Sequence, residues 1–124
     1  MPITSYNGLT MPAFMYGTAW KKEATAKLVE AAVDAGFRSI DTANQLIHYD
    51  EALVGEALLA LKQKGIERES LFLQTKFTSV NGQDSRTPYD AKANLTTQVN
   101  QSMTSSLKHL HTEYLDSYVL HGPY

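Results

Sequence analysis

Short apolar stretches alternate with longer amphipathic stretches along this chain, and this alternation is the feature that most restricts its fold. The patterns predict strands at 13–16, 37–41, 71–77 and 114–120, and helices at 22–35, 50–64 and 88–110. Strands that alternate with helices of ten or more residues pair in parallel through right-handed crossovers. The fold class is therefore α/β, and the pattern alone leaves both a doubly wound sheet and a (β/α)₈ barrel open.

Turn and capping residues mark where these elements begin and end. Asn7-Gly8 predicts a type I′ turn in a short hairpin within residues 1–12, and Gly36 and Gly65 are placed to end the first two helices. Thr87-Pro88 is typical of a helix start, with threonine as the N-cap. The inward stripe of the third helix is predicted from its spacing as Leu95, Val99, Met103, Leu107 and Leu110.

Composition excludes several classes of function. The chain has 124 residues, 43% of them hydrophobic, which fits one domain with a buried core. A formal charge of −2 with scattered basic residues argues against a nucleic-acid partner. No stretch approaches the about 18 apolar residues of a membrane span, and no leader is recognised, so we expect a cytoplasmic protein without a membrane partner. The absence of cysteine excludes thiol catalysis, and no metal site is predicted.

Three of the predicted strands carry polar residues on one face and end in an ionisable residue. The polar tracks are Ser39 and Asp41, then Gln74 and Lys76, then Ser117 and His121. Because side chains alternate between the faces of a strand, each pair shares a face. The carboxyl ends of parallel strands form the rim that carries the active sites of such folds. We therefore expect Asp41, Lys76 and His121 to meet at one rim.

Each of these residues also has a structural explanation. Asp41 could cap the turn that follows it, and Lys76 could extend its amine to solvent. His121 could be a hydrogen-bonded core histidine, and Tyr49 could be the apolar start of a helix. Their joint position at one rim favours the functional interpretation.

Several motifs occur in order along nearly the whole chain. They are Gly17-Thr18 with Trp20 close behind, the run Ala35 to Ala43, Val54-Gly55-Glu56-Ala57-Leu58, Thr75-Lys76, Tyr114-Leu115-Asp116 and Leu120-His121-Gly122-Pro123. Together they resemble the aldo-keto reductases. The resemblance implies that residues 1–124 are the N-terminal half of a (β/α)₈ TIM barrel, a partial aldo-keto reductase domain, with residues 1–12 as the hairpin that closes the barrel bottom.

The resemblance also implies an activity, the reduction of aldehydes or ketones with NADPH. Carried over by position, the catalytic residues are Asp41, Tyr49, Lys76 and His121. Tyr49 would donate the proton, Lys76 and Asp41 would lower the pKa of its hydroxyl, and His121 would orient the carbonyl. The implied cofactor contacts are Gly17, Thr18, Ala19 and Asp41, and the implied substrate contacts are Trp20, His48 and His121.

The tyrosine lies in a loop that departs from the family pattern. Most members place it five positions after the aspartate, where this chain has Leu46, whereas Tyr49 comes eight positions after Asp41. We identify Tyr49 because no other tyrosine lies between Asp41 and the Val54-Gly55 motif. A second departure is Gly122, which follows His121 where a tryptophan is more usual.

Two other functions remain open at this stage. A lysine at the end of a barrel strand also suits a Schiff-base lyase of the class I aldolase type, with Lys76 as the nucleophile. A half-barrel could also serve as a non-catalytic interaction module, and its unpaired edges predict self-association. Since the family keeps most cofactor contacts in the second half of the barrel, we expect the isolated chain to be inactive.

Overall fold

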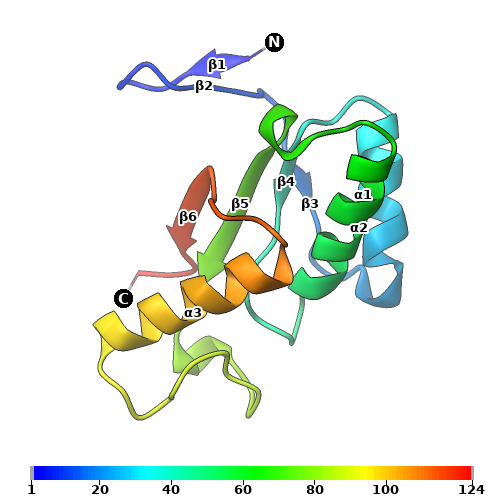
Figure 1. The fold of residues 1–124 in the computed structure, drawn as a ribbon. Helices are drawn as coiled ribbons and strands as arrows, with labels where there is room; N and C mark the ends of the chain where they lie inside the picture. Colours follow the sequence, from blue (N-terminus) through cyan, green and yellow to red (C-terminus); the bar gives the residue numbers. More distant parts are fainter. Residues whose placement is uncertain (1, 124) are drawn as a thin grey trace.

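The computed structural model describes residues 2–123 and confirms the predicted order of a hairpin followed by alternating strands and helices (Figure 1). The strands are β1 (Ile3–Thr4), β2 (Thr10–Met11), β3 (Tyr16–Gly17), β4 (Ser39–Asp41), β5 (Phe72–Phe77) and β6 (Ser117–Leu120). The α-helices are α1 (Thr25–Asp34), α2 (Glu51–Gln63) and α3 (Leu95–His109). Three short 3₁₀ turns lie at Lys22–Ala24, Arg68–Ser70 and Val80–Gly82.

The four strands that follow the hairpin form one parallel sheet in the order β3-β4-β5-β6. The register aligns Gly17 with Asp41, Asp41 with Gln74, and Gln74 with Ser117. Sequential parallel strands joined by helices are the repeating unit of a (β/α)₈ barrel, so the predicted α/β class and the half-barrel topology are confirmed. All four strands end at the same edge of the sheet.

The helices cover one face of the sheet and leave the other face polar. Along β5, Leu73, Thr75 and Phe77 are buried under the helices, whereas Gln74 and Lys76 are half-buried on the opposite face. The apolar core between helices and sheet contains Val29, Val33, Ile40, Val54, Leu61, Leu73 and Leu110. The alternation of polar and apolar residues along β5 therefore decides which face of the sheet carries the candidate site residues.

Glycine ends the first two helices, as predicted. Gly36 (φ +113°) follows α1, and Gly65 (φ +93°) follows α2. The amide after each glycine donates a hydrogen bond to a carbonyl in the last turns of the helix: Phe37 donates to Ala32, and Ile66 donates to Leu61. A residue with a side chain is strained at this positive φ, so glycine sets both helix ends.

The predicted start of the third helix is wrong. Helix α3 begins at Leu95, and its N-cap is Asn94, whose side chain accepts a hydrogen bond from the Thr97 amide at 2.9 Å. The segment around Thr87-Pro88 is a loop instead, because Tyr89 is buried against Phe77 (ring centroids 5.5 Å apart). Burial of this ring outweighs the local preference for a helix start.

The predicted inward stripe of α3 is confirmed only at its end, where Leu110 is buried in the apolar core, whereas Val99, Met103 and Leu107 are half-buried. Leu95 is 53% exposed, and the residues of α3 that are buried are Gln98, Ser102 and Ser106. They face polar partners: Asn44 donates to the Ser102 carbonyl, and Ser106 donates to Glu51. Helix α3 therefore packs through a polar face that apolar periodicity does not detect.

The hairpin forms where it was expected but with a different turn. Strands β1 and β2 are antiparallel, and the Ser5 amide donates to the Leu9 carbonyl, which leaves a three-residue loop. Gly8 has φ +89°, whereas Asn7 is not among the positive-φ residues of the chain from 2 to 123. This is a type I turn followed by a left-handed glycine, so the predicted type I′ turn is wrong.

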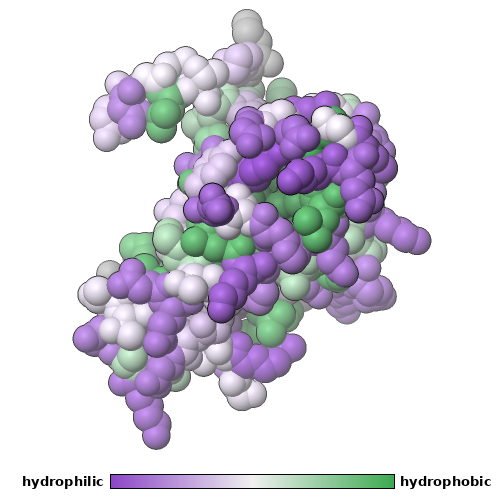
Figure 2. Space-filling view, viewed as in Figure 1, coloured by the Kyte–Doolittle hydropathy of each residue, from purple (hydrophilic) through white to green (hydrophobic). Residues whose placement is uncertain are grey.

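The hairpin projects beyond the main body on the side opposite to the carboxyl ends of β5 and β6 (Figures 1 and 2). A cavity of about 520 Å³ lies beside it, between Thr10–Phe14 and Ala35–Arg38.

None of the helices described for residues 2–123 is both long and apolar enough to span a membrane.

Candidate active site

The carboxyl ends of β4 and β5 bring Asp41 and Lys76 together. Nζ of Lys76 lies 2.8 Å from Oδ2 of Asp41, and the side chains are only 13% and 18% exposed. The same ammonium donates to the Thr42 carbonyl at 3.0 Å. The ion pair therefore holds the lysine at the rim rather than in solvent, in contrast to the surface interpretation left open by the sequence.

The altered loop after β4 places Tyr49 beside this ion pair. The Tyr49 hydroxyl accepts a hydrogen bond from Nζ of Lys76 at 3.5 Å, and the ammonium also lies 4.8 Å from the centroid of the ring. Gln45 holds the loop, because its side chain accepts from the His48 amide and donates to the Gly82 carbonyl. The displaced tyrosine thus reaches Lys76 despite the changed spacing.

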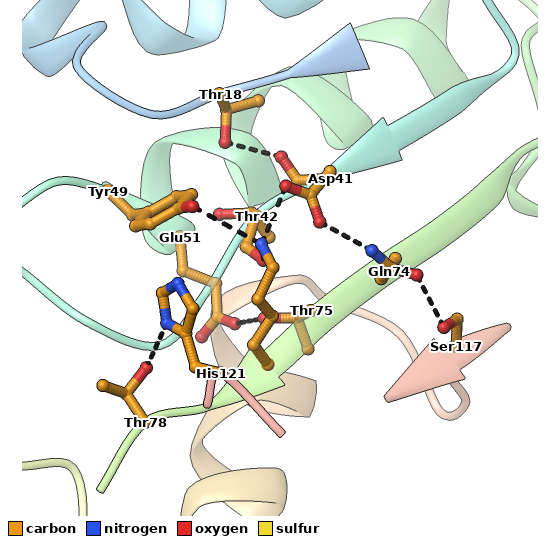
Figure 3. Close-up of polar contacts among 11 residues, drawn as sticks. Thr18, Asp41, Thr42, Tyr49, Glu51, Gln74, Thr75, Thr78, Ser117 and His121 are labelled. Atoms are coloured by element: carbon orange, nitrogen blue, oxygen red, sulfur yellow. Dashed lines mark hydrogen bonds and ion pairs between the residues drawn. The ribbon is translucent and has the colours of Figure 1, made fainter. Parts of the chain in front are cut away.

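His121 closes the group on the side of β6. Its ring lies edge-on to Tyr49, with centroids 5.7 Å apart, and its Nδ1 lies 2.7 Å from Oγ1 of Thr78 (Figure 3). Burial lowers the pKa of His121, and the nearby Lys76 ammonium lowers it further. Both effects favour the neutral imidazole over the protonated form.

A line of hydrogen bonds across the strands orients Asp41. Gln74 donates to Oδ1 of Asp41 at 2.9 Å, and Ser117 donates to the Gln74 side-chain oxygen at 2.7 Å (Figure 3). Because Lys76 takes the other carboxylate oxygen, both oxygens of Asp41 are engaged. Four residues of the predicted polar tracks thus form one connected network, namely Asp41, Gln74, Lys76 and Ser117. The Ser39 hydroxyl has no hydrogen-bond partner among residues 2–123, and the His121 ring bonds to Thr78 instead.

A cleft of about 400 Å³ opens at this rim. Tyr49 and His121 line it, together with Ala19, Trp20, Gln45, His48, Thr78, Ser79, Asn81 and Gly82. The rings of Trp20 and His48 lie against each other, with centroids 4.1 Å apart, and the Trp20 amide donates to the His48 carbonyl. Trp20 has φ +64°, a backbone conformation that is costly for a bulky residue, and its side chain remains exposed.

Three of the four residues predicted to contact a cofactor, Gly17, Thr18 and Ala19, lie at the end of β3, and the fourth, Asp41, ends the neighbouring strand β4. Thr18 is fully buried, and its amide and hydroxyl both donate to the Asp41 carbonyl, at 3.1 and 2.8 Å. Gly17 is exposed, and a Cβ built on it would meet no atom within 4 Å. Thr18 therefore ties the end of β3 to β4, while the surface beside Gly17 is open.

A second polar cluster lies behind the sheet. The carboxylate of Glu51 is 2% exposed and accepts hydrogen bonds from Thr75 (2.5 Å), Ser106 (2.8 Å) and Nδ1 of His109 (2.8 Å). The bond to Glu51 raises the pKa of His109. This cluster joins α2, β5 and α3 and lies outside the cleft.

Among residues 2–123, no group of three or more histidine, aspartate or glutamate side chains could hold a metal ion.

Thr78 and Tyr89 are not among the site residues predicted from the sequence. Thr78 is the first residue after β5. It lies two residues after Lys76, so the alternation of side chains that places Gln74 and Lys76 on one face would place Thr78 on that face as well. Tyr89 has no such signal, because it reaches the site through a loop. Its hydroxyl donates to the Thr78 carbonyl at 2.7 Å.

Comparisons with known proteins identify the family of the chain. Residues 9–124 match the family model described as "Aldo/keto reductase family". The chain is 32% identical over 117 residues to "Methylglyoxal reductase DkgB" of Salmonella typhi, covering 93% of this chain and 37% of the relative. It is 35% identical over 125 residues to an "Aldo-keto reductase" of Mycobacterium sp. (strain MCS), covering 99% and 38%.

Solved structures give the same result. The aldose reductase from Schistosoma japonicum superposes with a TM-score of 0.77 at 28% identity, covering 99% of this chain and 37% of that chain. An aldo/keto reductase from Brucella melitensis superposes with a TM-score of 0.72 at 30% identity, covering 97% and 41%. The chain thus spans somewhat over a third of the length of the relatives it matches. The match over residues 9–124 and the identity to these relatives show that the chain belongs to the aldo/keto reductase family.

Proposed function

We propose that the protein carrying this chain is an NADP-dependent oxidoreductase that reduces aldehydes or ketones to alcohols. Family membership supports carbonyl oxidoreduction with a nicotinamide cofactor. The observation that carries the proposal is the position of the Lys76 ammonium between the Asp41 carboxylate (2.8 Å) and the hydroxyl of Tyr49 (3.5 Å), a residue that lines the cleft.

In the proposed reaction Tyr49 is the proton donor. A carbonyl oxygen that gains negative charge during reduction needs a proton, and the Tyr49 hydroxyl lines the cleft where this oxygen would lie. A positive charge about 4 Å from the resulting phenolate stabilises it by about 4 kcal/mol at an effective dielectric of about 20. Lys76 would supply that charge, and Asp41 would keep the ammonium in place.

His121 would orient the carbonyl. Its ring lies beside Tyr49 and lines the same cleft, so a carbonyl oxygen in hydrogen-bond reach of Tyr49 would also be near the imidazole. A neutral imidazole donates one hydrogen bond without competing with Tyr49 as an acid. Trp20 and His48 would contact the remainder of the substrate at the mouth of the cleft.

The hydride would come from a nicotinamide group, since no side chain supplies one. The residues of this chain that would hold it are Gly17, Ala19 and Asp41, and the open surface beside Gly17 fits a flat ring lying against the end of β3. Thr18 would act on the same site by fixing Asp41 from behind. The choice of NADP over NAD follows only from the resemblance to the family.

The Schiff-base alternative has no support in the site. Nucleophilic attack requires a lone pair on the lysine nitrogen. All three N–H donors of the Lys76 ammonium are engaged, by Asp41, Thr42 and Tyr49. The interaction-module alternative is likewise unsupported by any feature of the cleft.

Self-association and a cytoplasmic location stay predictions. The prediction of self-association rests on the exposed side chains of Val119 and Leu120 in β6.

A carbonyl-reduction assay tests the proposal. The protein that carries this chain is mixed with NADPH and a panel of aldehydes and ketones, and the loss of reduced cofactor is followed by absorbance. We expect turnover with the wild type and its loss in Lys76→Met. Borohydride trapping runs in parallel: a stable adduct at Lys76 without NADPH oxidation would reject the reductase in favour of a lyase.

A further inference from the structure

The contact between Thr78 and His121 joins the end of β5 to the end of β6. Oγ1 of Thr78 and Nδ1 of His121 are 2.7 Å apart, and Thr78 is 3% exposed. Within residues 2–123 the Thr78 hydroxyl forms this one hydrogen bond. Figure 3 shows the second ring nitrogen of His121 on the opposite side of the ring, toward Tyr49.

The direction of this hydrogen bond decides where the proton of His121 lies. If Nδ1 carried the proton and donated to Thr78, the hydroxyl hydrogen of Thr78 would be buried without an acceptor. If Thr78 donates to Nδ1, both groups are satisfied, and the proton of a neutral imidazole must lie on Nε2. Burial disfavours the first arrangement, because buried polar groups are almost always paired.

The surrounding residues hold Thr78 in this orientation. The Thr78 carbonyl accepts hydrogen bonds from the Tyr89 hydroxyl at 2.7 Å and from the Gln83 side chain at 3.4 Å. Gly82 lies against the methyl group of Thr78 so closely that a Cβ at this position would be 2.6 Å from Cγ2. The methyl group is therefore confined on the side of Gly82, and the hydroxyl is directed to His121.

The backbone fixes the other partner. The His121 amide donates to the Phe77 carbonyl at 2.9 Å, which extends the pairing of β5 and β6 to the residues that carry the two side chains. Both groups of the contact are thus set by the sheet and by the loop that follows β5, and neither depends on a mobile surface group.

We infer that Thr78 is a positioning residue that fixes the tautomer of His121, so that the imidazole presents an N–H at Nε2 to the cleft. A donor is what an orienting group needs to hold a carbonyl oxygen, since the other tautomer would present a lone pair and repel it. The chemical meaning of the inference rests on the proposed function, whereas the tautomer itself is a property of the chain.

Nitrogen NMR of the histidine side chains tests the inference without cofactor or substrate. The 124-residue chain is labelled with ¹⁵N-histidine and measured near neutral pH, and His121→Asn identifies the His121 signals. In the wild type we expect Nδ1 to be unprotonated and Nε2 to be protonated. His109 is an internal comparison, because its Nδ1 faces the Glu51 carboxylate and is expected to carry a proton.

Two substitutions of Thr78 separate its hydroxyl from its shape. Thr78→Val keeps the volume and removes the donor, so the Nδ1 resonance should shift and both neutral tautomers should appear. Thr78→Ser keeps the hydroxyl and should retain the wild-type spectrum. A protonated Nδ1 in wild-type His121 would overturn the inference, even if the valine variant fails to fold, and so would a Thr78→Val spectrum equal to wild type. Failure of the carbonyl-reduction assay with the expected spectra would reject the proposed function alone.

Discussion

Nζ of Lys76 and Oδ2 of Asp41 lie 2.8 Å apart across two neighbouring parallel strands. The register of β4 and β5 pairs Asp41 with Gln74. Lys76 lies two residues after Gln74 and therefore on the same face of the sheet. The ion pair is therefore a consequence of strand alternation combined with sheet register, and its two partners should be energetically coupled.

A double-mutant cycle measures this coupling. Lys76→Met leaves the Asp41 carboxylate unpaired in a largely buried place, so it should lower the free energy of unfolding by about 3 kcal/mol. Asp41→Asn should also destabilise, and the double variant should be more stable than the sum of the singles by about 1–2 kcal/mol, measured by urea denaturation. The control is Lys64→Met with Glu30→Gln, a more exposed pair at 3.2 Å whose coupling should stay below about 1 kcal/mol. Equal coupling in the two pairs would contradict the burial argument.

Tyr49→Phe tests the proton donor. Removing the hydroxyl should lower kcat for carbonyl reduction about 10²- to 10⁴-fold. NADPH binding, measured by fluorescence titration, should stay unchanged because the ring remains. Tyr6→Phe in the hairpin is the matched control, since Tyr6 is fully exposed and far from the cleft. Turnover like that of the wild type in the Tyr49 variant would show that another group donates the proton.

The pKa values of two histidines should lie on opposite sides of 6.5. Burial and Lys76 lower the pKa of His121 below this value, whereas Glu51 raises the pKa of His109 above it. NMR titration of the labelled chain gives both midpoints in one experiment. Lys76→Met should move the His121 midpoint upward by removing the ammonium, and a downward shift would contradict the assigned cause.

Gly55→Ala should destabilise the packing of α2 on α3. A Cβ at Gly55 would lie 1.8 Å from the carbonyl oxygen of His109, so the two helices would have to separate. The expected loss in the free energy of unfolding is about 1–3 kcal/mol, although alanine favours the helix intrinsically. Glu56→Ala, at the exposed neighbouring position, should change stability by less than about 0.5 kcal/mol. A stabilised Gly55→Ala variant would mean that the contact relaxes without cost.

The Glu51–His109 pair should make stability depend on pH. Because the folded-state pKa of His109 is raised above 6.5, the protonated imidazole contributes its full stability below 6.5, and this contribution is lost as pH rises through the folded pKa. His109→Gln should therefore destabilise more near pH 6 than near pH 9. The difference should be about 1 kcal/mol or less, since the imidazole side chain is 38% exposed and screened.

The Glu51→Gln background is the control for this pH dependence. Without the carboxylate the pKa of His109 has no cause to rise, so the penalty for His109→Gln should be nearly the same at both pH values. A penalty that grows with pH in the wild-type background would reverse the sign and reject the assignment.

Hydrophobic periodicity determined the order of strands and helices, and glycine determined where α1 and α2 end. Both are local: the 2- and 3.6-residue periods decide which face is buried, and a positive φ is strained for other residues. The same alternation by itself places Asp41, Lys76 and His121 on one rim.

Tertiary structure decided the rest. The start of α3 depends on the burial of Tyr89 against Phe77, and the polar inner face of α3 depends on Glu51 and Asn44, which lie more than forty residues earlier in the chain. The reach of Tyr49 to Lys76 depends on the path of a loop held by Gln45. Such contacts join residues that are distant along the chain, so no local period records them. Only the folded arrangement shows that Lys76 contacts both Asp41 and Tyr49, and that Tyr49 and His121 line one cleft.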